Sequence, residues 1–450
     1  MMKSFMPLIL GSDRSMADSV EDEVPGFGSE GVVPGENHAQ KGEPAKHPWG
    51  VQYQGPFESA TDGSARAVRL HARALNDAGV PVLLQSFTNT FLGPEGVRVG
   101  AQAMDERIKA STHDLRHQSI GELRLRVKHL VVFSAEHLRS VIVPHYVAIE
   151  KNAETAIAIR QRLYDTTIVY SVWERSTISE PVAAILRRVG ECWVPCSDNK
   201  HLLEKHGVER VTVVPHPYDE ASELTKLTRR APMAKKAFYS IGLWQPRKHY
   251  HETIGAFLIA FKPTDAASLT IKHRYAPLPD YPSPAASVDI WLADPRVIAQ
   301  GWTMKNLSPS LWLPSGDWPE SRITELHFKS NIYVCASRGE AYALPAFDAK
   351  VSGNRMLYTG YGGMCDFAGA GDVLIPFTME RVPPVYGWEE GAEWAVATVD
   401  DIATAMRNVV IPELYERPAC LASCTMPAVG QLMKARCEAV LERAALRGRL

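Results

Sequence analysis

An alternation of short apolar runs with amphipathic segments constrains the fold more than any other feature of the sequence, and it occurs twice along the chain. Buried strands of a parallel sheet form apolar runs of about four to eight residues, and the helices that join them cover the sheet. In the first half we expect strands at residues 51–57, 80–87, 129–134, 166–174, 192–197 and 211–216. Helices are expected at residues 64–77 and 197–207. This pattern predicts a parallel sheet with helices on both faces.

The same alternation restarts after a polar, charged segment at residues 220–236 that has no apolar period. Strands are expected at residues 238–244, 268–274, 297–302, 330–337 and 355–360, and helices at residues 251–262, 321–330 and 344–353. A chain of 450 residues exceeds the size of one ordinary hydrophobic core. We therefore expect an α/β protein with a doubly wound parallel sheet in each of two domains.

Four regions follow from these breaks. Residues 1–46 are rich in Gly, Pro, Ser and Glu and are expected to form a flexible N-terminal extension. The first domain is assigned to residues 47–222 and the second to residues 223–425. Residues 426–450 include an Ala-, Leu- and Arg-rich stretch that predicts a C-terminal helix, and packing of this helix back on the first domain stays open.

Composition and charge argue against several classes of protein. A formal net charge of −2 gives no general support for nucleic-acid binding, although a local basic groove stays open. No run approaches the roughly 18 apolar residues of a membrane span, so no integral membrane segment is expected. The seven cysteines are scattered and lack zinc-ligand spacing, which favours free thiols in a reducing compartment. We expect a cytoplasmic protein, and peripheral contact with a membrane stays open.

Two carboxylates lie eight positions apart where an expected strand passes into an expected helix. Glu340 precedes the helix, Asp348 lies about one turn inside it, and Pro345 suits a first helical turn. The free N–H groups of that turn form an anion site, so the two acids could grip the ends of a ligand whose middle is a phosphate group. The alternative is that Glu340 caps the helix and Asp348 interacts with its dipole. The spacing alone favours that alternative.

Basic residues follow the first expected strand of the second domain. Arg247 and Lys248 stand just beyond this strand, and Gly242 lies at its end. Two adjacent cations at a loop–helix junction can neutralise a diphosphate without a metal, whereas the simpler interpretation is a solvated basic loop. In the first domain, Gly63 lies between a strand and a helix, where it allows the backbone to approach a ligand closely.

Three blocks of the sequence, in this order, resemble the retaining, nucleotide-sugar-dependent glycosyltransferases of the GT-B fold (glycosyltransferase group 1, family-four-like). They are residues 170–219, the run IGLWQPRKHYHETIGAFLIAF at residues 241–261, and GEAYALPAFDAKVSGNRMLYTGYGG at residues 339–363. The third block is similar to the family's Glu-x7-Glu motif. The likeness runs from about Trp49 to the C-terminus and is loose between the blocks. It implies two Rossmann-like domains facing a central cleft, with the acceptor on the first domain and the nucleotide sugar on the second.

The activity implied by the resemblance is transfer of a hexosyl or pentosyl group from a nucleotide sugar to an acceptor hydroxyl, with retention at the anomeric carbon. No metal and no other cofactor is implied, and no Asp-x-Asp motif follows an apolar strand. The acceptor stays unidentified: a glycan, a lipid-linked sugar, a protein or a modified nucleic-acid base would each be compatible.

The resemblance also implies roles for individual residues. Arg247 and Lys248 correspond to the pair that binds the donor diphosphate and stabilises it as it leaves. Glu340 corresponds to the acid that contacts the donor sugar. Asp348 stands where the family usually has a Glu that holds the ribose hydroxyls, and because Asp is one methylene shorter, the contact could shift or the donor preference could differ. The rest of the implied donor-binding set consists of Gly63, Gly242, Ala343 and Leu344.

Glu174 is the remaining catalytic candidate, because it ends an expected strand of the first domain. It could bind the acceptor hydroxyl or assist its deprotonation, or it could be a structural carboxylate, and we weigh the two equally. A histidine of the first domain often contacts the donor sugar in this family. None of the candidates can be aligned with it, and a structural role is favoured for each: His137, His145 and His216. Trp302 could stack on the nucleotide base, although a core role is favoured.

Two rival interpretations stay open. One is a GT-B scaffold or binding protein without catalytic activity, for which the Asp at position 348 is a mild argument. The other is a sugar-nucleotide epimerase on the same fold, which would release free nucleotide and an altered sugar without any acceptor.

Overall fold

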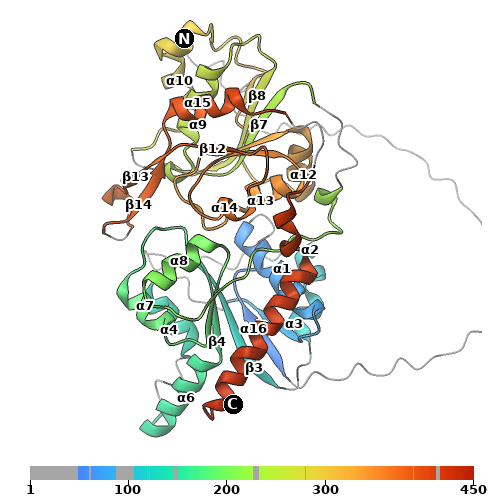
Figure 1. Ribbon diagram of the computed structural model, residues 1–450, viewed down its shortest axis with the longest axis vertical. Coiled ribbons are helices and arrows are strands. Elements are labelled where there is room, and N and C mark those ends of the chain that lie inside the picture. Colours follow the sequence, from blue (N-terminus) through green and yellow to red (C-terminus); the bar gives the residue numbers. More distant parts are fainter. Residues whose placement is uncertain are drawn as a thin grey trace, which may run out of the picture.

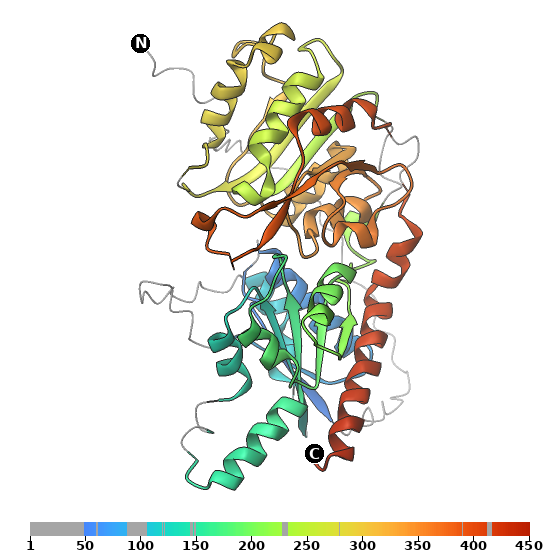
Figure 2. The same ribbon diagram turned by 60° about the vertical axis from the view of Figure 1, so that its left-hand side comes forward.

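The computed structural model describes residues 49–59, 62–87, 106–118, 120, 122–144, 147, 150–226, 233–278, 280–388, 390–411 and 416–450. The extension predicted for residues 1–46 lies outside this part of the chain. Figure 1 shows two α/β domains that follow one another along the long axis, and Figure 2 shows the same arrangement after a rotation about that axis.

The first domain is built on a six-stranded parallel sheet with the order β2-β1-β3-β4-β5-β6. Its strands are β1 (Gly50–Gln54), β2 (Val82–Gln85), β3 (Leu123–Val131), β4 (Thr167–Val172), β5 (Glu191–Val194) and β6 (Val211–Val213). Its helices are α1 (Gly63–Asp77), α2 (Glu106–Ser111), α3 (His113–His117), α4 (Ala135–Ile142), α6 (Ala153–Asp165), α7 (Glu180–Leu186) and α8 (Ser197–Lys205). The order reverses between β1 and β3, which opens a crevice at the carboxyl ends of these strands.

The second domain repeats this design with a parallel sheet of order β12-β11-β10-β7-β8-β9. Its strands are β7 (Lys236–Trp244), β8 (Ala267–Tyr275), β9 (Leu311–Trp312), β10 (Ile332–Cys335), β11 (Arg355–Thr359) and β12 (Val373–Ile375), and an antiparallel pair follows, β13 (Thr378–Arg381) and β14 (Glu393–Val396). Its helices are α9 (Tyr250–Ala260), α10 (Pro284–Leu292), α11 (Pro295–Ala299), α12 (Glu320–Lys329), α13 (Leu344–Val351), α14 (Met364–Phe367) and α15 (Val399–Asn408).

The last helix, α16 (Met426–Leu446), leaves the second domain and runs along the first, as the red helix in Figure 1 shows. It lies so close to α1 that a Cβ atom on Gly430 would be 2.2 Å from the carbonyl oxygen of Ala74. Buried Glu191 of β5 accepts hydrogen bonds from Arg436 and Arg443 of α16, each at 2.7 Å. The helix therefore fastens the end of the chain to the first sheet. The domain boundaries at residues 222 and 425 stay predictions.

One prediction of a strand, at residues 297–302, is wrong. The apolar run at residues 297–302 does not pair with a sheet but belongs largely to the helix α11. Asp294 caps this helix through the backbone N–H of Arg296, and Pro295 occupies its first turn, so a helix-start signal overrides a short apolar run that is ambiguous by itself. Trp302 is buried and donates its indole N–H to the carbonyl oxygen of Phe261 at 2.8 Å, in agreement with a core role.

The predicted fold class, an α/β protein with a doubly wound parallel sheet in each of two domains, is confirmed. All seven cysteines are free, as expected. Among the described helices, none is both long enough and apolar enough to cross a membrane.

Candidate active site between the domains

A cavity of about 450 Å³ lies between the two domains at the carboxyl ends of their strands. The first domain contributes the start of α1 and the ends of β3 and β4, and the second contributes the end of β7 and the segment before α13. The cavity wall includes every site residue expected from the sequence except Asp348: Gly63, Glu174, Gly242, Arg247, Lys248, Glu340, Ala343 and Leu344.

Glu340 is the centre of a buried charged cluster. Its carboxylate pairs with Lys248, lies 3.2 Å from the guanidinium of Arg247, and accepts a hydrogen bond of 2.8 Å from the hydroxyl of Ser337. Only 4% of its side-chain surface is exposed. Burial opposes ionisation, but the charges of Lys248 and Arg247 and the hydrogen bonds outweigh it and lower the pKa of Glu340 to about 2. The carboxylate is therefore ionised throughout the physiological range.

The guanidinium of Arg247 joins the two domains. Its Nη2 atom lies 2.9 Å from Oε1 of Glu174, which follows β4 of the first domain. Burial disfavours the charged form, yet the carboxylates of Glu174 and Glu340 raise the pKa of Arg247 above its usual value. A fixed positive charge thus stands between an acid of each domain. Glu174 is engaged in this ion pair, and its role toward the acceptor stays a prediction.

Backbone groups complete the cavity wall. Helix α13 begins at Leu344 after Ala343, which has a φ of +62°, and Pro345 occupies the first turn. Gly63, at the start of α1, faces this turn across the cavity, because a Cβ atom there would lie 3.2 Å from Cδ1 of Leu344. Two helix N-termini from different domains therefore meet here. The carboxylate of Asp62 caps the N–H groups of α1, whereas α13 has no side-chain cap, so its first turn favours a negatively charged ligand.

Asp348 lies away from the cavity. Its buried carboxylate forms an ion pair with Arg66 of α1, across the domain interface. The Oδ1 atom of Asp348 is buried and has no hydrogen-bond partner within the described part of the chain. The ribose contact implied by the resemblance stays a prediction, and in this arrangement Asp348 joins the domains.

We expect the pair between Arg66 and Asp348 to be coupled energetically. Arg66→Ala and Asp348→Ala should each lower the free energy of unfolding by roughly 1–3 kcal/mol, and the double variant should lose less than the two together. Urea unfolding followed by tryptophan fluorescence gives these values. Arg73→Ala is the matched control on the same helix, because Arg73 forms a more exposed pair with Asp114; its cost should be ~0–1 kcal/mol. Strictly additive losses for the Arg66–Asp348 cycle would contradict the expected coupling.

Reciprocal hydrogen bonds also hold the domains together. The backbone N–H of Ser197, at the start of α8, donates to Asp366 of the second domain at 2.7 Å. Asp198, the next residue, accepts from the backbone N–H of Gly362 at 2.6 Å. These two hydrogen bonds therefore link the domains beside the cavity.

Two histidines of the cavity wall differ from the expectations. Sequence reasoning missed His129 and favoured a structural role for His216. His129, at the carboxyl end of β3, was not among the candidate histidines, and it lines the cavity together with His216. Its Nδ1 atom lies 3.0 Å from the hydroxyl of Tyr53, and its buried Nε2 atom has no partner among the described residues. The alternation of β3 is the signal that would have found it, because His129 shares the sheet face of Leu125 and Val127. His137 is not part of the cavity wall, and His145 lies outside the described residues.

Within the described ranges, no group of three or more His, Cys, Asp or Glu side chains could hold a metal ion. Four basic side chains line the cavity: Arg247, Lys248, Lys272 and Arg274.

No protein-family model and no curated protein matches this sequence. Solved structures show limited similarity. HepE from Anabaena, in a complex with UDP and glucose, is 10% identical, with 90% of this chain and 100% of that chain covered at a TM-score of 0.45. A glycosyltransferase from Rickettsia africae is 9% identical, with coverages of 89% and 97% and a TM-score of 0.46. AviGT4, a glycosyltransferase involved in avilamycin A biosynthesis, is 14% identical, with coverages of 87% and 98% and a TM-score of 0.45.

Proposed function

We propose that this protein is a retaining, metal-independent glycosyltransferase that uses a nucleotide sugar. The observation that carries the proposal is the placement of Arg247 and Lys248 beside the uncapped N-terminus of α13, in the cavity between the two doubly wound domains. The cavity volume of about 450 Å³ lies in the range of pockets for ligands of this size.

In the proposed complex, the donor diphosphate lies over the first turn of α13, and Arg247 and Lys248 neutralise it. Both cations are held in place before the donor binds, because Glu340 contacts each of them. A preorganised cation costs little reorganisation when negative charge develops on the leaving phosphate. Arg247 would exchange its contact with Glu174 for the phosphate, which releases the carboxylate of Glu174 toward the acceptor.

The proposed reaction proceeds on one face of the sugar. The bond from the anomeric carbon to the diphosphate oxygen breaks, a bond to the acceptor oxygen forms on the same side, and the acceptor proton passes to the departing diphosphate. The carboxylates of the cavity wall support this proposal because each is engaged: Asp62 caps α1, while Glu174 and Glu340 pair with cations. None is set apart as a covalent nucleophile.

A nucleotide-sugar panel tests the proposal. We expect one class among UDP-, GDP-, ADP- and TDP-sugars to raise the melting temperature by several degrees, because ligand at about 100 times its Kd adds about 2.7 kcal/mol. The Arg247→Ala/Lys248→Ala variant should lose this shift. A matched control, Lys305→Ala/Arg407→Ala, removes two exposed cations of the same domain and should keep it.

Absence of any shift at millimolar sugar nucleotide would refute the donor site. A shift without transfer to any acceptor would favour a binding protein, and release of free nucleotide with an altered sugar in the absence of acceptor would favour an epimerase.

A further inference from the structure

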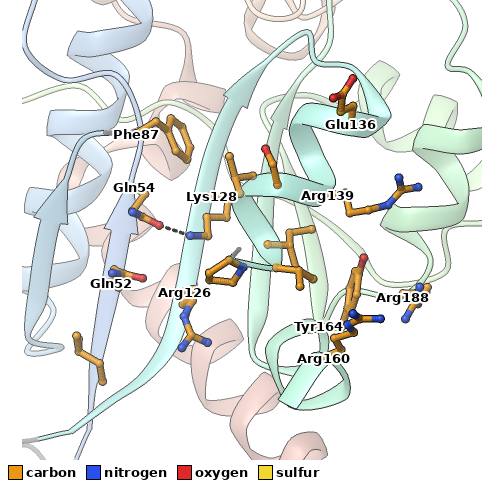
Figure 3. A pocket seen from close by; sticks show the side chains of 16 residues that line it. Gln52, Gln54, Phe87, Arg126, Lys128, Glu136, Arg139, Arg160, Tyr164 and Arg188 are labelled. Carbon is orange, nitrogen blue, oxygen red and sulfur yellow. Dashed lines mark hydrogen bonds between the residues drawn. The ribbon is translucent and has the colours of Figure 1, made fainter. Parts of the chain in front are cut away.

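A second and larger hollow lies on the first domain, away from the interdomain cavity. Its volume is about 1010 Å³, and it shares no lining residue with that cavity. Figure 3 shows that its side chains come from β1 and β3 on one side and from α4 and α6 on the other. Nothing in the proposed sugar transfer uses this hollow.

The hollow exists because one face of β1 and β3 is polar. In β1, Val51 and Tyr53 point into the hydrophobic core, while Gln52 and Gln54 point into the hollow. Parallel sheets are normally covered by apolar packing on both faces. Here the second face of β1 and β3 carries amides and cations instead. Such polar side chains are typical of a solvated binding surface and not of a hydrophobic core.

Basic side chains dominate the wall. Five are basic and one is acidic: Arg126, Lys128, Arg139, Arg160, Arg188 and Glu136. Glu136 lies at the edge of the hollow in Figure 3, away from Arg126 and Lys128. The side chains that line the hollow therefore carry more positive than negative charge.

Lys128 forms the buried floor. Only 5% of this residue is exposed, and its ammonium group donates to Oε1 of Gln54, the dashed line in Figure 3. No ion pair of Lys128 with a carboxylate occurs within the described ranges. Desolvation by burial, followed by the charge of Arg126, lowers the pKa of Lys128 to about 7. A buried amine held only by an amide oxygen is an unusual arrangement for a structural side chain, because a buried charge is normally paired.

The rim is formed by arginines. Arg188 is held over the ring of Tyr164, with its guanidinium carbon 4.1 Å from the ring centre. In the part of the chain that the structure describes, neither Arg139 nor Arg160 forms an ion pair with a carboxylate. A planar guanidinium group can donate two parallel hydrogen bonds to two oxygens of one phosphate group, and a desolvated ammonium adds a point charge.

We propose that this hollow binds a ligand that carries several phosphate groups. A neutral sugar would leave the buried ammonium of Lys128 uncompensated, whereas a polyphosphorylated ligand satisfies the floor and the rim together. The volume is at the upper end of ordinary ligand sites, so the ligand is larger than a single phosphate ion. This site does not depend on the proposed sugar transfer.

Isothermal titration calorimetry with inorganic tripolyphosphate tests the site. The Arg247→Ala/Lys248→Ala variant of the full chain serves as the background, because the interdomain cavity would otherwise bind the same probe. In this background we expect one binding event at low salt. Lys128→Gln and Arg139→Gln should each weaken it by about tenfold or more, as expected for loss of a charge-assisted hydrogen bond. Adding Lys305→Gln/Arg407→Gln, which removes two exposed cations elsewhere, should change it by about twofold or less.

Proton uptake provides an independent readout. A bound polyanion favours the charged form of Lys128, so affinity should fall as the pH rises from about 7 to 9, and Lys128→Gln should flatten this dependence. If Lys128→Gln does not fold, Arg139→Gln carries the test, because Arg139 is exposed. No binding of tripolyphosphate, or equal weakening in the control variant, would overturn the proposal.

Two further arms identify the source of the phosphate groups. Citrate, a tricarboxylate of lower charge, should bind more weakly than tripolyphosphate, and equal binding would contradict a phosphate site. Sedimentation with phosphatidylcholine vesicles, with and without phosphatidylglycerol, distinguishes a lipid headgroup from a soluble ligand. Vesicle binding that depends on Lys128 and Arg139 supports the headgroup, and tripolyphosphate binding without vesicle binding supports the soluble ligand.

Discussion

Replacing Glu340 by glutamine is expected to lower the free energy of unfolding by about 3–5 kcal/mol and to abolish binding of a nucleotide sugar. The amide keeps the size of the side chain but removes the charge that balances Lys248 and Arg247, whose side chains are 15% and 11% exposed. Two nearly buried cations then lack their shared counter-ion, and the remaining acid, Glu174, contacts only Arg247 among these two. Urea unfolding measures the loss of stability, and the thermal shift with the sugar nucleotide measures the loss of binding.

Glu180→Gln is the matched control for this experiment. Glu180 also forms an ion pair, with Arg187, but both side chains face solvent, so its loss should change stability far less. A small effect of Glu340→Gln on stability, equal to that of the control, would mean that the charged cluster does not organise the site. If Glu340→Gln loses the expected stability but binds the nucleotide sugar as the wild type does, the charged cluster is structural and not part of the donor site.

The cluster itself could be predicted because each of its members lies at a strand end that the local sequence marks. Arg247 and Lys248 follow an apolar run, Glu340 follows another, and a parallel sheet brings such ends to one edge. Their meeting at one edge required only that both strands belong to the same parallel sheet, which the alternating pattern predicts. The identity of the ligand did not follow, because a diphosphate, a sulfate or a carboxylate would use the same cations.

Contacts between distant segments could not be predicted in this way. Asp348 and Arg66 are 282 positions apart, and no local pattern shows that the second turn of α13 faces α1. The contact between Glu191 and α16 could not be predicted either, because an acid within an apolar run does not indicate which distant residue it will bind. His129 and Lys128 alternate on β3, so one faces the interdomain cavity and the other the outer hollow. That division became visible only when the extent of β3 was known.

Lowering the pH from 7 to about 5 is expected to destabilise the protein by several kcal/mol through three buried histidines. His71, His129 and His216 lie together inside the first domain, with the ring centres of His71 and His216 5.2 Å apart. Desolvation by burial lowers the pKa of His71 to about 4. Burial and then mutual repulsion lower the pKa values of His129 and His216 well below the ordinary value. All three are therefore neutral in the folded protein near neutral pH.

The direction of the pH effect follows from these depressed pKa values. The unfolded chain binds protons at its histidines from about pH 6.5 downward, whereas in the folded protein His71 does not do so until about pH 4, and the pKa values of His129 and His216 are depressed in the same direction. Stability is therefore complete above pH 6.5 and falls as the pH decreases through this window. Each neutral histidine costs up to ~1.4 kcal/mol per pH unit, so three give a slope of roughly 4 kcal/mol per unit, a large fraction of the ~5–15 kcal/mol of an ordinary domain.

Urea unfolding at a series of pH values between 7.5 and 5 measures this slope. His216→Gln should reduce it by about one third, because one of the three protons no longer binds on unfolding. His113→Gln, which removes an exposed histidine of α3, is the control and should leave the slope unchanged. An unchanged slope in His216→Gln would show that His216 is already charged in the folded protein, and the cluster would then be an internal positive charge facing the donor phosphates rather than a neutral wall of the cavity.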